Sequence, residues 1–432
     1  MKVSHLNTFP YGGAANAALR LHHQMMSDGI QSSFLYTIKD RDEPDGPGVH
    51  KISWRQTPGR RNPISKLFEK RRQRRIYSLY DDYLADRDED LELFSMPELV
   101  EQTVFQNSSP KQIIHLHWLA FMVDYPTFFN SIPATTPIVW TLHDMNPFTG
   151  GCHYSGGCDQ FIQGCGYCPL VDLEGPKDIS RQGFNTKRQL LRRKDLTIVA
   201  PSEWMLNLAK SSPIFSQSTN FHHIRLGFDL QTLYPINKQT ARKLLGLKSQ
   251  KILIGFGCES INNPRKGFDL LLASLKALPN QSDVECVVFG SGIPENLSAD
   301  IPKIHNLGFI DDPKKLTQFY SACDFVVVPS REDNQPQVGL EAMACGTPVV
   351  AFDVGGIGEY VKPGITGWLA RSEKTQDLCV QMTKLIVDSD SRQVMGRRCR
   401  QMMQQDFDIV QQSKKYVQLY QSLLNSAARK AA

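Results

Sequence analysis

Short apolar runs recur along the chain, and most are followed by a polar or glycine-containing loop and then by a segment with helical periodicity. Such runs are typical of strands in a parallel sheet whose two faces are both covered by helices. The runs expected to be strands are Met1–Leu6, Ser33–Tyr36, Ile113–Trp118, Ile138–Leu142, Leu196–Ala200, Lys251–Gly257, Val287–Gly292, Phe325–Val328 and Val349–Phe352. The pattern therefore predicts an α/β protein built from doubly wound parallel sheets.

The length and composition place the chain among globular enzymes with more than one domain. At 432 residues it is long enough for two or three domains, each with its own core. A hydrophobic content of 41% without a long apolar run excludes a membrane-spanning helix. The first residues lack the regions of a signal peptide, so we expect a cytoplasmic protein without a disulfide framework. Six of the ten cysteines are scattered and are expected to be mostly buried thiols.

The most informative stretch runs from Pro329 to Phe352, between two apolar strands. Its polar loop leads into a short helix, expected from about Val338 to Cys345, and Gly346 suits the position after that helix. Asp333 lies in the loop and Glu341 in the helix, with seven residues between them. Ligands of parallel sheets bind beyond the carboxyl ends of the strands, so two carboxylates here can accept hydrogen bonds from hydroxyls of one ligand. The alternative is a solvated loop acid and a helix acid paired with a base.

The segment Glu341–Val349, EAMACGTPV, resembles the signature of the retaining glycosyltransferases of family 4, in which an acid is followed after seven residues by Glu. The resemblance extends over most of the chain and is more specific in the C-terminal half. It implies the GT-B fold, in which two Rossmann-like doubly wound domains face a central cleft. The acceptor-side domain is then expected at residues 1–230 and the nucleotide-sugar-binding domain at residues 231–404. Residues 405–432 are expected to form a helix that crosses back to the N-terminal domain.

The resemblance also implies roles for individual residues. It assigns Glu341 to the ribose hydroxyls of the nucleotide and Asp333, at a position that is usually Glu, to the transferred sugar. His143, which follows the strand Ile138–Leu142, is implied to lie beside the reacting sugar; the alternative is a core histidine held by Asp144. The remaining donor-binding residues that it implies are Gly12, Gly13, Phe309, Ile310, Asn334 and Gln335. Gly12 and Gly13 are equally compatible with a tight turn between a strand and a helix.

Arg265 and Lys266 precede Gly267 and an amphipathic helix expected at Phe268–Leu278. Two cations at the start of a helix suit a diphosphate, because the helix dipole also favours an anion. They would stabilise the charge that grows on a diphosphate leaving group as the sugar–phosphate bond breaks. The alternative is a pair of surface cations. Family 4 usually carries another base earlier in this loop, in the region where Ser260 stands.

Four cysteines lie close together in a glycine-rich stretch, Pro147 to Pro169, with the spacing C-x5-C-x6-C-x2-C. The last pair has the spacing of a zinc knuckle, and glycines let the backbone wrap around an ion. Four thiolates would form a closed structural zinc site, with no open position for chemistry. Free thiols or redox-sensitive pairs are the alternatives. The four residues are Cys152, Cys158, Cys165 and Cys168.

An insertion expected at about residues 55–95 carries two runs of opposite charge. Residues 60–75 contain eight Lys or Arg against one acid, and residues 81–92 contain seven acids against one Arg. The basic run suits a helix on an anionic membrane surface, whereas the blander interpretation is that the two runs pair or are solvated. We expect no nucleic-acid binding, because Phe68 is the only aromatic residue within the basic run.

The predicted function is retaining transfer of a sugar from a nucleoside-diphosphate sugar to a saccharide or lipid-linked saccharide, in polysaccharide biosynthesis. We expect it in the cytoplasm, with peripheral contact at the inner face of the cell membrane as an option. No Asp-x-Asp metal motif follows a strand, so no catalytic metal is expected and the nucleotide sugar is the only small-molecule requirement. The alternatives are a GT-B nucleotide-sugar epimerase and a catalytically inactive relative that binds sugar nucleotides.

Overall fold

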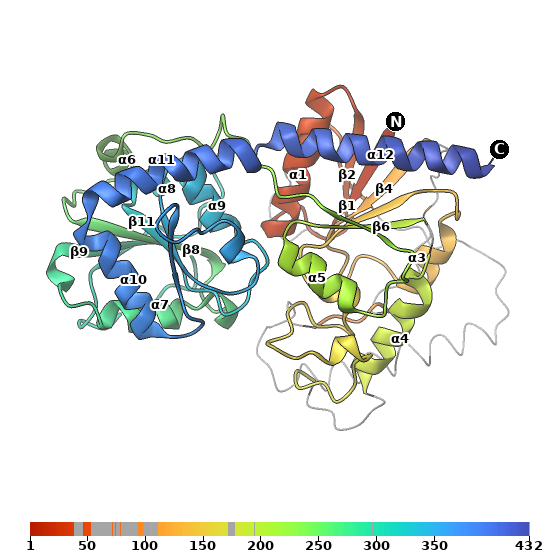
Figure 1. Ribbon diagram of the computed structural model, residues 1–432, viewed down its shortest axis with the longest axis horizontal. Coiled ribbons are helices and arrows are strands. Elements are labelled where there is room, and N and C mark those ends of the chain that lie inside the picture. Colours follow the sequence, from red (N-terminus) through yellow and green to blue (C-terminus); the bar gives the residue numbers. More distant parts are fainter. Residues whose placement is uncertain are drawn as a thin grey trace. The chain divides into compact units, whose positions relative to one another are not determined.

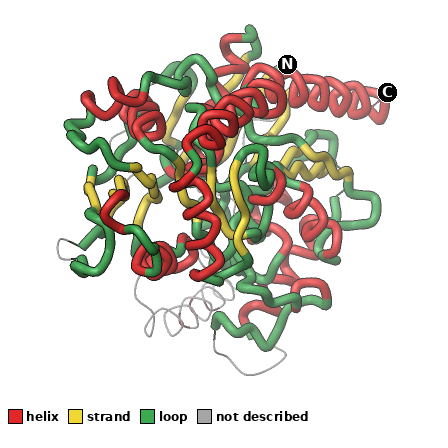
Figure 2. The backbone as a smooth tube through the Cα atoms, turned by 60° about the vertical axis from the view of Figure 1, so that its left-hand side comes forward, coloured by secondary structure: helices red, strands yellow, loops and turns green. Residues whose placement is uncertain are grey.

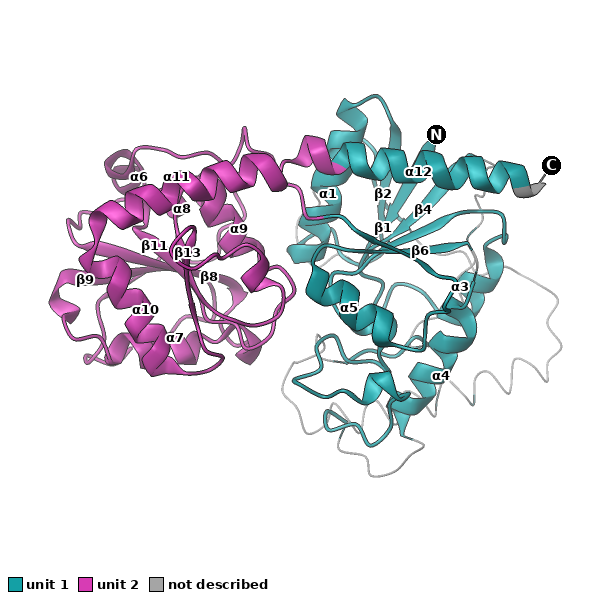
Figure 3. Cartoon of the chain, in the orientation of Figure 1, with its two compact units in different colours: residues 1–224, 413–432 teal, residues 225–412 magenta. Residues whose placement is uncertain are grey.

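The computed structural model describes residues 1–38, 46–52, 71, 74, 78, 94–98, 105, 111–171, 178–193, 195–294 and 297–431. These residues form two compact units, shown in separate colours in Figure 3. Unit 1 comprises Met1–Ile224 and Ser413–Ala432, and unit 2 comprises Arg225–Gln412. Strands and helices alternate along most of the described chain (Figure 2).

Unit 1 contains a parallel sheet in the order β3-β2-β1-β4-β5-β6-β7. Its described strands are β1 (Lys2–Leu6), β2 (Gln31–Tyr36), β3 (Val49–Lys51), β4 (Gln112–Leu116), β5 (Ile138–Thr141), β6 (Leu196–Ala200) and β7 (Asn220–His223). Its described helices are α1 (Gly12–Ser27), α3 (Tyr125–Ser131), α4 (Ile179–Leu191), α5 (Glu203–Ser211) and most of α12 (Ile409–Ala431).

Alternate residues of these strands face opposite layers of helices, as the pleat of a strand requires. Val3, Ile113 and Val139 pack in one apolar cluster with residues of α1 and α12. Their neighbours Ile114, Ile138 and Trp140 pack in another with residues of α3, α4 and α5. Both faces of the sheet are thus buried, which explains why the central strands β4, β5 and β6 are buried at every residue rather than at alternate residues.

Unit 2 contains a second parallel sheet, in the order β10-β9-β8-β11-β12-β13. Figure 1 shows α7 and α10 on one side of this sheet and α6, α8 and α11 on the other. Its described strands are β8 (Ile252–Ser260), β9 (Val284–Ser291), β10 (Ile304–Asn306), β11 (Phe325–Val328), β12 (Val349–Phe352) and β13 (Gly367–Ala370). Its described helices are α6 (Lys238–Leu244), α7 (Phe268–Lys276), α8 (Pro313–Ala322), α9 (Gln337–Ala344), α10 (Thr375–Val387) and α11 (Ser389–Asp406).

The two parallel sheets confirm the predicted doubly wound α/β class. The strands expected at Leu196–Ala200, Phe325–Val328 and Val349–Phe352 agree with the structure to the residue. The helix expected over residues 405–432 is shorter in the structure. It begins at Ile409, because Asp408 caps it by accepting a hydrogen bond from the backbone N–H of Val410.

Most of the charged insertion lies outside the described residues. Within the basic run, residues 60–75, only positions 71 and 74 are described, and the acidic run at 81–92 is not described at all. The membrane-surface interpretation of the basic run therefore stays a prediction. Among the helices that the structure describes, none combines the length and the apolar character that crossing a bilayer requires.

Candidate active site

Two cations and a buried carboxylate meet in unit 2, at the loop after β8. Asn263 caps the short 3-10 helix Pro264–Lys266 by accepting a hydrogen bond from the backbone N–H of Arg265. Lys266 Nζ lies 2.7 Å from Asp333 Oδ2, and Arg265 Nη1 lies 3.0 Å from the same oxygen. Burial opposes ionisation of Asp333, but Lys266 and Arg265 outweigh it and hold the pKa of this carboxyl below its usual range. The structure thus joins the predicted diphosphate cations to the predicted sugar-contacting acid.

Two glycines allow the loops around this ion pair to approach one another. Gly267 has a φ of +72°, and a Cβ there would lie 2.0 Å from the carbonyl oxygen of Pro329. Gly355 has a φ of +58°, and a Cβ there would lie 1.7 Å from the carbonyl oxygen of Asp333. Both positions exclude other residues by conformation and by space. The loops after β8, β11 and β12 therefore converge at one edge of the sheet.

Asn334 and Gln335 continue the loop that carries Asp333, and both are buried. The backbone N–H of Asn334 donates a hydrogen bond to Asp333 Oδ1 over 3.0 Å, which orients the carboxylate. The amide group of Gln335 has no hydrogen-bond partner for Oε1 or Nε2 within the described part of the chain. Because buried polar atoms are nearly always hydrogen-bonded in folded proteins, this amide is a candidate for contact with a ligand.

Glu341 lies in α9 and is buried against α8. The phenol of Tyr320 donates a hydrogen bond to Glu341 Oε2 over 2.7 Å. This contact fixes the orientation of the carboxylate behind the loop of Asp333. Sequence reasoning missed Tyr320, since only the packing of α8 against α9 brings it to Glu341.

Phe309 and Ile310 follow β10 in the same unit. Phe309 is 46% exposed, whereas Ile310 is buried. The backbone N–H of Gly290, at the end of β9, donates a hydrogen bond to the carbonyl of Gly308 over 3.0 Å. Because β8, β9, β10 and β11 are parallel, this segment and the loop of Lys266 lie at the same edge of the sheet.

In unit 1, Gly12 and Gly13 form the first turn of α1, directly beyond the carboxyl end of β1. Tyr11 occupies the N-cap position without a capping hydrogen bond from its side chain. Gly12 has a φ of +86°, which glycine adopts readily. The sharp entry into α1 accounts for the glycine at position 12, and the predicted donor contact of this turn stays a prediction.

His143 follows β5, and its Nε2 lies 3.0 Å from Nδ1 of His117. Burial lowers the pKa of His143 to about 4, against the opposing effect of Asp144, so the ring is neutral near pH 7. Asp144 in turn accepts hydrogen bonds from Trp118 Nε1 over 2.7 Å and from His153 Nδ1 over 2.6 Å. His143 thus has a hydrogen-bond partner in His117, which the packing of neighbouring strands brings to it.

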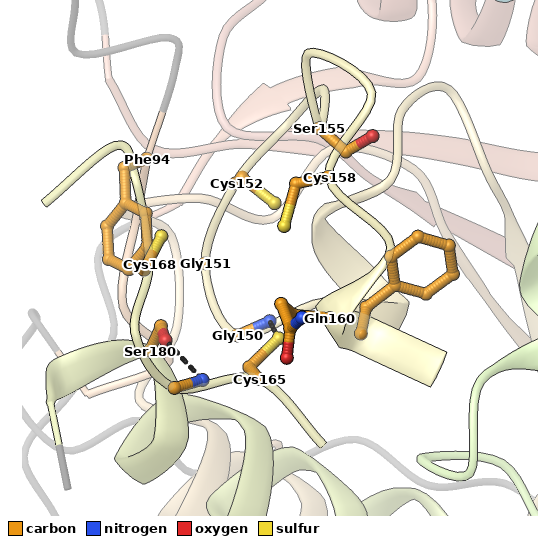
Figure 4. Close-up of a pocket in the computed structure, with 12 residues that line it drawn as sticks. Phe94, Gly150, Gly151, Cys152, Ser155, Cys158, Gln160, Cys165, Cys168 and Ser180 are labelled. Carbon is orange, nitrogen blue, oxygen red and sulfur yellow. Dashed lines mark hydrogen bonds between the residues drawn. The ribbon is translucent and has the colours of Figure 1, made fainter. Parts of the chain in front are cut away.

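The four clustered cysteines line one small cavity in unit 1, together with glycines and the rings of Phe94 and Phe161 (Figure 4). The sulfur of Cys165 accepts a hydrogen bond from the backbone N–H of Gly150 over 3.2 Å. Cys165 and Tyr167, on either side of Gly166, have positive φ values, as do Gly164 and Gly166, so the backbone turns tightly here. The nearby His153, which the sequence also offers as a substitute ligand, is engaged at both nitrogens, Nδ1 with Asp144 and Nε2 with Ser95.

The four thiols line one cavity, but their sulfur atoms are farther apart than the sulfur ligands of a tetrahedral zinc centre. Zinc bound at about 2.3 Å from each of four thiolates places the sulfurs about 3.8 Å apart. In the described part of the chain, only the ring nitrogens of His5, His115 and His117 come together as three or more candidate ligand atoms within 4.8 Å. Side-chain rotation of the cysteines into the cavity would be needed to hold one ion. The structural zinc site therefore stays a prediction.

Residues 251–388, most of unit 2, match the family described as glycosyl transferases group 1. Over 95% of its length the chain is 23% identical to WcaC of Escherichia coli (strain K12), whose name assigns it to colanic acid biosynthesis as a glycosyl transferase, and the match covers 97% of that protein. This chain is a glycosyltransferase. The family match falls on the unit that carries Arg265, Lys266, Asp333 and Glu341.

Solved structures of other proteins share the fold of this glycosyltransferase over nearly its whole length. Sucrose-phosphate synthase from Thermosynechococcus elongatus aligns with a TM-score of 0.69 at 19% identity, covering 98% of this chain and 99% of that one. HepE from Anabaena, solved with UDP-glucose, aligns with a TM-score of 0.63 at 18% identity, covering 98% of this chain and all of that one. The predicted GT-B fold is thereby confirmed.

Proposed function

We propose that this glycosyltransferase transfers a sugar from a nucleoside-diphosphate sugar to a hydroxyl group, with retention at the anomeric carbon. The observation that carries the proposal is the convergence of Lys266 and Arg265 on Asp333, at the carboxyl edge of the sheet in unit 2. The two cations offer three or more N–H donors to a diphosphate, while a single acid only partly neutralises them. The UDP-glucose in the HepE structure supports a nucleotide sugar as donor.

Within this proposal each residue has a defined part. Lys266 and Arg265 bind the diphosphate and stabilise its charge as the sugar leaves, which is electrostatic stabilisation without a catalytic metal. Glu341, held by Tyr320, accepts hydrogen bonds from the ribose hydroxyls. Asp333 and His143 contact the transferred sugar. Gly12, Gly13, Asn334, Gln335, Phe309 and Ile310 complete the donor site.

We propose a saccharide or lipid-linked saccharide as the acceptor, in the biosynthesis of a surface polysaccharide at the inner face of the cell membrane. The name of the E. coli relative WcaC, which refers to colanic acid, supports this assignment. The four-cysteine loop is proposed to bind a structural zinc ion that does not take part in transfer.

The first test is thermal denaturation of the full chain with UDP, GDP, ADP and dTDP and their glucose or mannose esters. A ligand at 100 times its Kd adds about 2.7 kcal/mol to the free energy of unfolding. We expect one nucleotide series to raise Tm. A flat response to the whole panel would contradict the donor site.

The product of the reaction separates transfer from the alternative activities. Transfer requires an added saccharide acceptor and releases nucleoside diphosphate in proportion to glycoside formed. An epimerase would convert the nucleotide sugar without an acceptor, and an inactive relative would bind nucleotide but form no product. Incubation of the stabilising donor with and without acceptor saccharides, followed by analysis of the anomeric configuration, distinguishes all three outcomes.

A further inference from the structure

A chain of three histidines runs inward from His143 through unit 1. His5 lies on β1, His117 directly follows β4, and His143 follows β5 after Leu142. These three strands are adjacent in the sheet. Nδ1 of His5 lies 3.0 Å from Nε2 of His117, and Nδ1 of His117 lies 3.0 Å from Nε2 of His143. Each hydrogen bond joins the ring nitrogens of two side chains, so it requires a proton on one nitrogen and a lone pair on the other.

The neighbouring His115 does not belong to this series of hydrogen-bonded histidines. Its Nδ1 lies 2.6 Å from the hydroxyl of Tyr420, and its Nε2 lies 2.7 Å from the hydroxyl of Thr141. The ring nitrogens of His5, His115 and His117 are close enough to suggest a cation site. Hydrogen bonds occupy five of these six nitrogens, however, and the exception is His5 Nε2. The arrangement is therefore a hydrogen-bond network. His115 is also buried, but it takes no part in the hydrogen bonds between His5, His117 and His143.

The imidazole rings of His5, His117 and His143 are all neutral at pH 7. His5 and His117 are buried, and burial lowers the pKa of both well below 6.5, with neighbouring histidines adding to the effect. The charged groups that act on His143 are Asp144 and Arg20, with opposite signs. A neutral imidazole carries one proton on one of its two nitrogens. The position of that proton is the only freedom left to each ring.

The two hydrogen bonds couple the three proton positions. If His5 carries its proton on Nδ1, His117 accepts it at Nε2, donates from Nδ1, and forces His143 to accept at Nε2. The proton of His143 is then on Nδ1. If instead His143 donates from Nε2, every proton shifts inward, and His5 must carry its proton on Nε2.

The environment of His5, the innermost of the three histidines, decides between these two states. Nε2 of His5 is buried and has no hydrogen-bond partner among the described residues. An N–H group buried without an acceptor costs about 1–3 kcal/mol, and such groups are rarer in folded proteins than acceptors that lack a donor. We propose that His5 and His117 are positioning residues that hold His143 as the neutral tautomer with its proton on Nδ1.

The consequence of this tautomer for sugar transfer rests on the proposed function. In the tautomer with its proton on Nδ1, His143 accepts the hydrogen bond of His117 at Nε2 and acts as a donor, not a base, at Nδ1. Such a donor suits an oxygen of the transferred sugar. The role of proton acceptor in transfer is then left to the leaving phosphate rather than to His143.

The test is ¹⁵N NMR of the full chain labelled at histidine, with long-range ¹H–¹⁵N correlations at pH 7.5. His143 is assigned by comparison with a His143→Gln variant. We expect a protonated Nδ1 and an unprotonated Nε2 for His143, and the same tautomer for His117 and His5. A protonated Nε2 on His143, or rapid averaging of the two tautomers, overturns the proposal. No nucleotide is present, so this outcome is independent of whether the proposed donor binds.

A pair of variants distinguishes the effect of the hydrogen bonds between the three histidines from a general effect of losing a buried ring. His117→Phe removes both hydrogen bonds of the series, whereas His115→Phe removes a buried ring two residues earlier, on β4, that takes no part in them. We expect the first variant to release His143 into a mixture of tautomers and the second to leave its spectrum unchanged. Equal effects of both variants on His143 contradict a positioning role. If His117→Phe does not fold, the spectrum of the unaltered protein still decides.

Discussion

Lys266 Nζ donates a hydrogen bond over 2.7 Å to Oδ2 of Asp333, a residue 67 positions later in the chain. The cation predicted to bind phosphate is therefore paired with an acid of the same unit. A diphosphate that binds Lys266 must either share this cation with the carboxylate of Asp333 or displace that carboxylate. In the proposed donor site, we therefore expect Asp333 to weaken the attraction of the two cations for a nucleotide.

We expect Asp333→Asn to separate stability from nucleotide binding. The variant leaves two cations near a neutral amide, so the free energy of unfolding should fall by about 1–3 kcal/mol. A nucleoside diphosphate should stabilise the variant at least as well as the original chain, because the cations no longer share the acid, while sugar transfer should be lost. Thermal denaturation with and without nucleotide measures both effects. Complete loss of the nucleotide shift would contradict the proposed division of roles.

Lys266→Gln should reduce kcat/KM for sugar transfer by about 10²–10³-fold, the usual cost of losing one contact to a developing negative charge. The matched control is Lys276→Gln on α7, which removes an exposed lysine paired with Asp300. The control should retain full activity and an unchanged nucleotide shift. Similar losses in both variants would mean that general charge, rather than the position of Lys266, attracts the donor.

Glu341→Gln should weaken nucleotide binding while the fold persists. The glutamine retains an oxygen that accepts the hydrogen bond of Tyr320 but loses the charge that strengthens hydrogen bonds to ribose. Hydrogen bonds to charged groups contribute about 1.5–3 kcal/mol, so Kd should rise by roughly 10–100-fold. Calorimetric titration with the stabilising nucleotide measures the change. An unchanged Kd would remove the ribose assignment, and Glu373→Gln, which alters an exposed acid, is the control.

Acid should destabilise unit 1 through its buried histidines. Burial lowers the pKa of His115 well below 6.5 and that of His143 to about 4, so the unfolded chain binds more protons than the native chain below pH 6.5. The free energy of unfolding therefore falls as pH decreases from 6.5 towards 4, by about 1 kcal/mol per histidine between pH 6.5 and 5.5. Denaturant titrations should show a shallower decline in His115→Phe than in the original chain. The exposed His50→Gln variant should follow the original chain, and a parallel decline in His115→Phe would refute the linkage.

Metal analysis of purified, reduced protein should find about one zinc ion per chain if the four cysteines form the predicted site. Removal of the ion by a chelator should lower Tm, because binding energy of a structural metal is folding energy. Cys165→Ser should lose the metal, whereas Cys286→Ser, which alters a buried thiol of β9, should retain it. Iron with inorganic sulfide, or no metal in undamaged protein, would each contradict zinc.

The order of apolar runs along the chain was enough to predict the parallel sheets of both units, and local motifs nominated the residues proposed for the donor site in unit 2. Apolar runs identify buried parallel strands, since both of their faces must be covered, and the spacing of Asp333 and Glu341 falls within one strand–loop–helix segment. Arg265 and Lys266 were predictable because they stand beside a glycine at the start of a helix. Local order along the chain carries all of these signals.

Which side chains pair depends on how the elements pack in three dimensions. Tyr320 reaches Glu341 because α8 packs against α9, and Lys266 reaches Asp333 because two loops converge on glycines that leave no room for a Cβ. The link from His143 through His117 to His5 depends on the order of three strands that are far apart in the sequence. A sequence pattern records periodicity within an element, whereas hydrogen bonds between elements depend on strand order and helix packing, which the pattern does not encode.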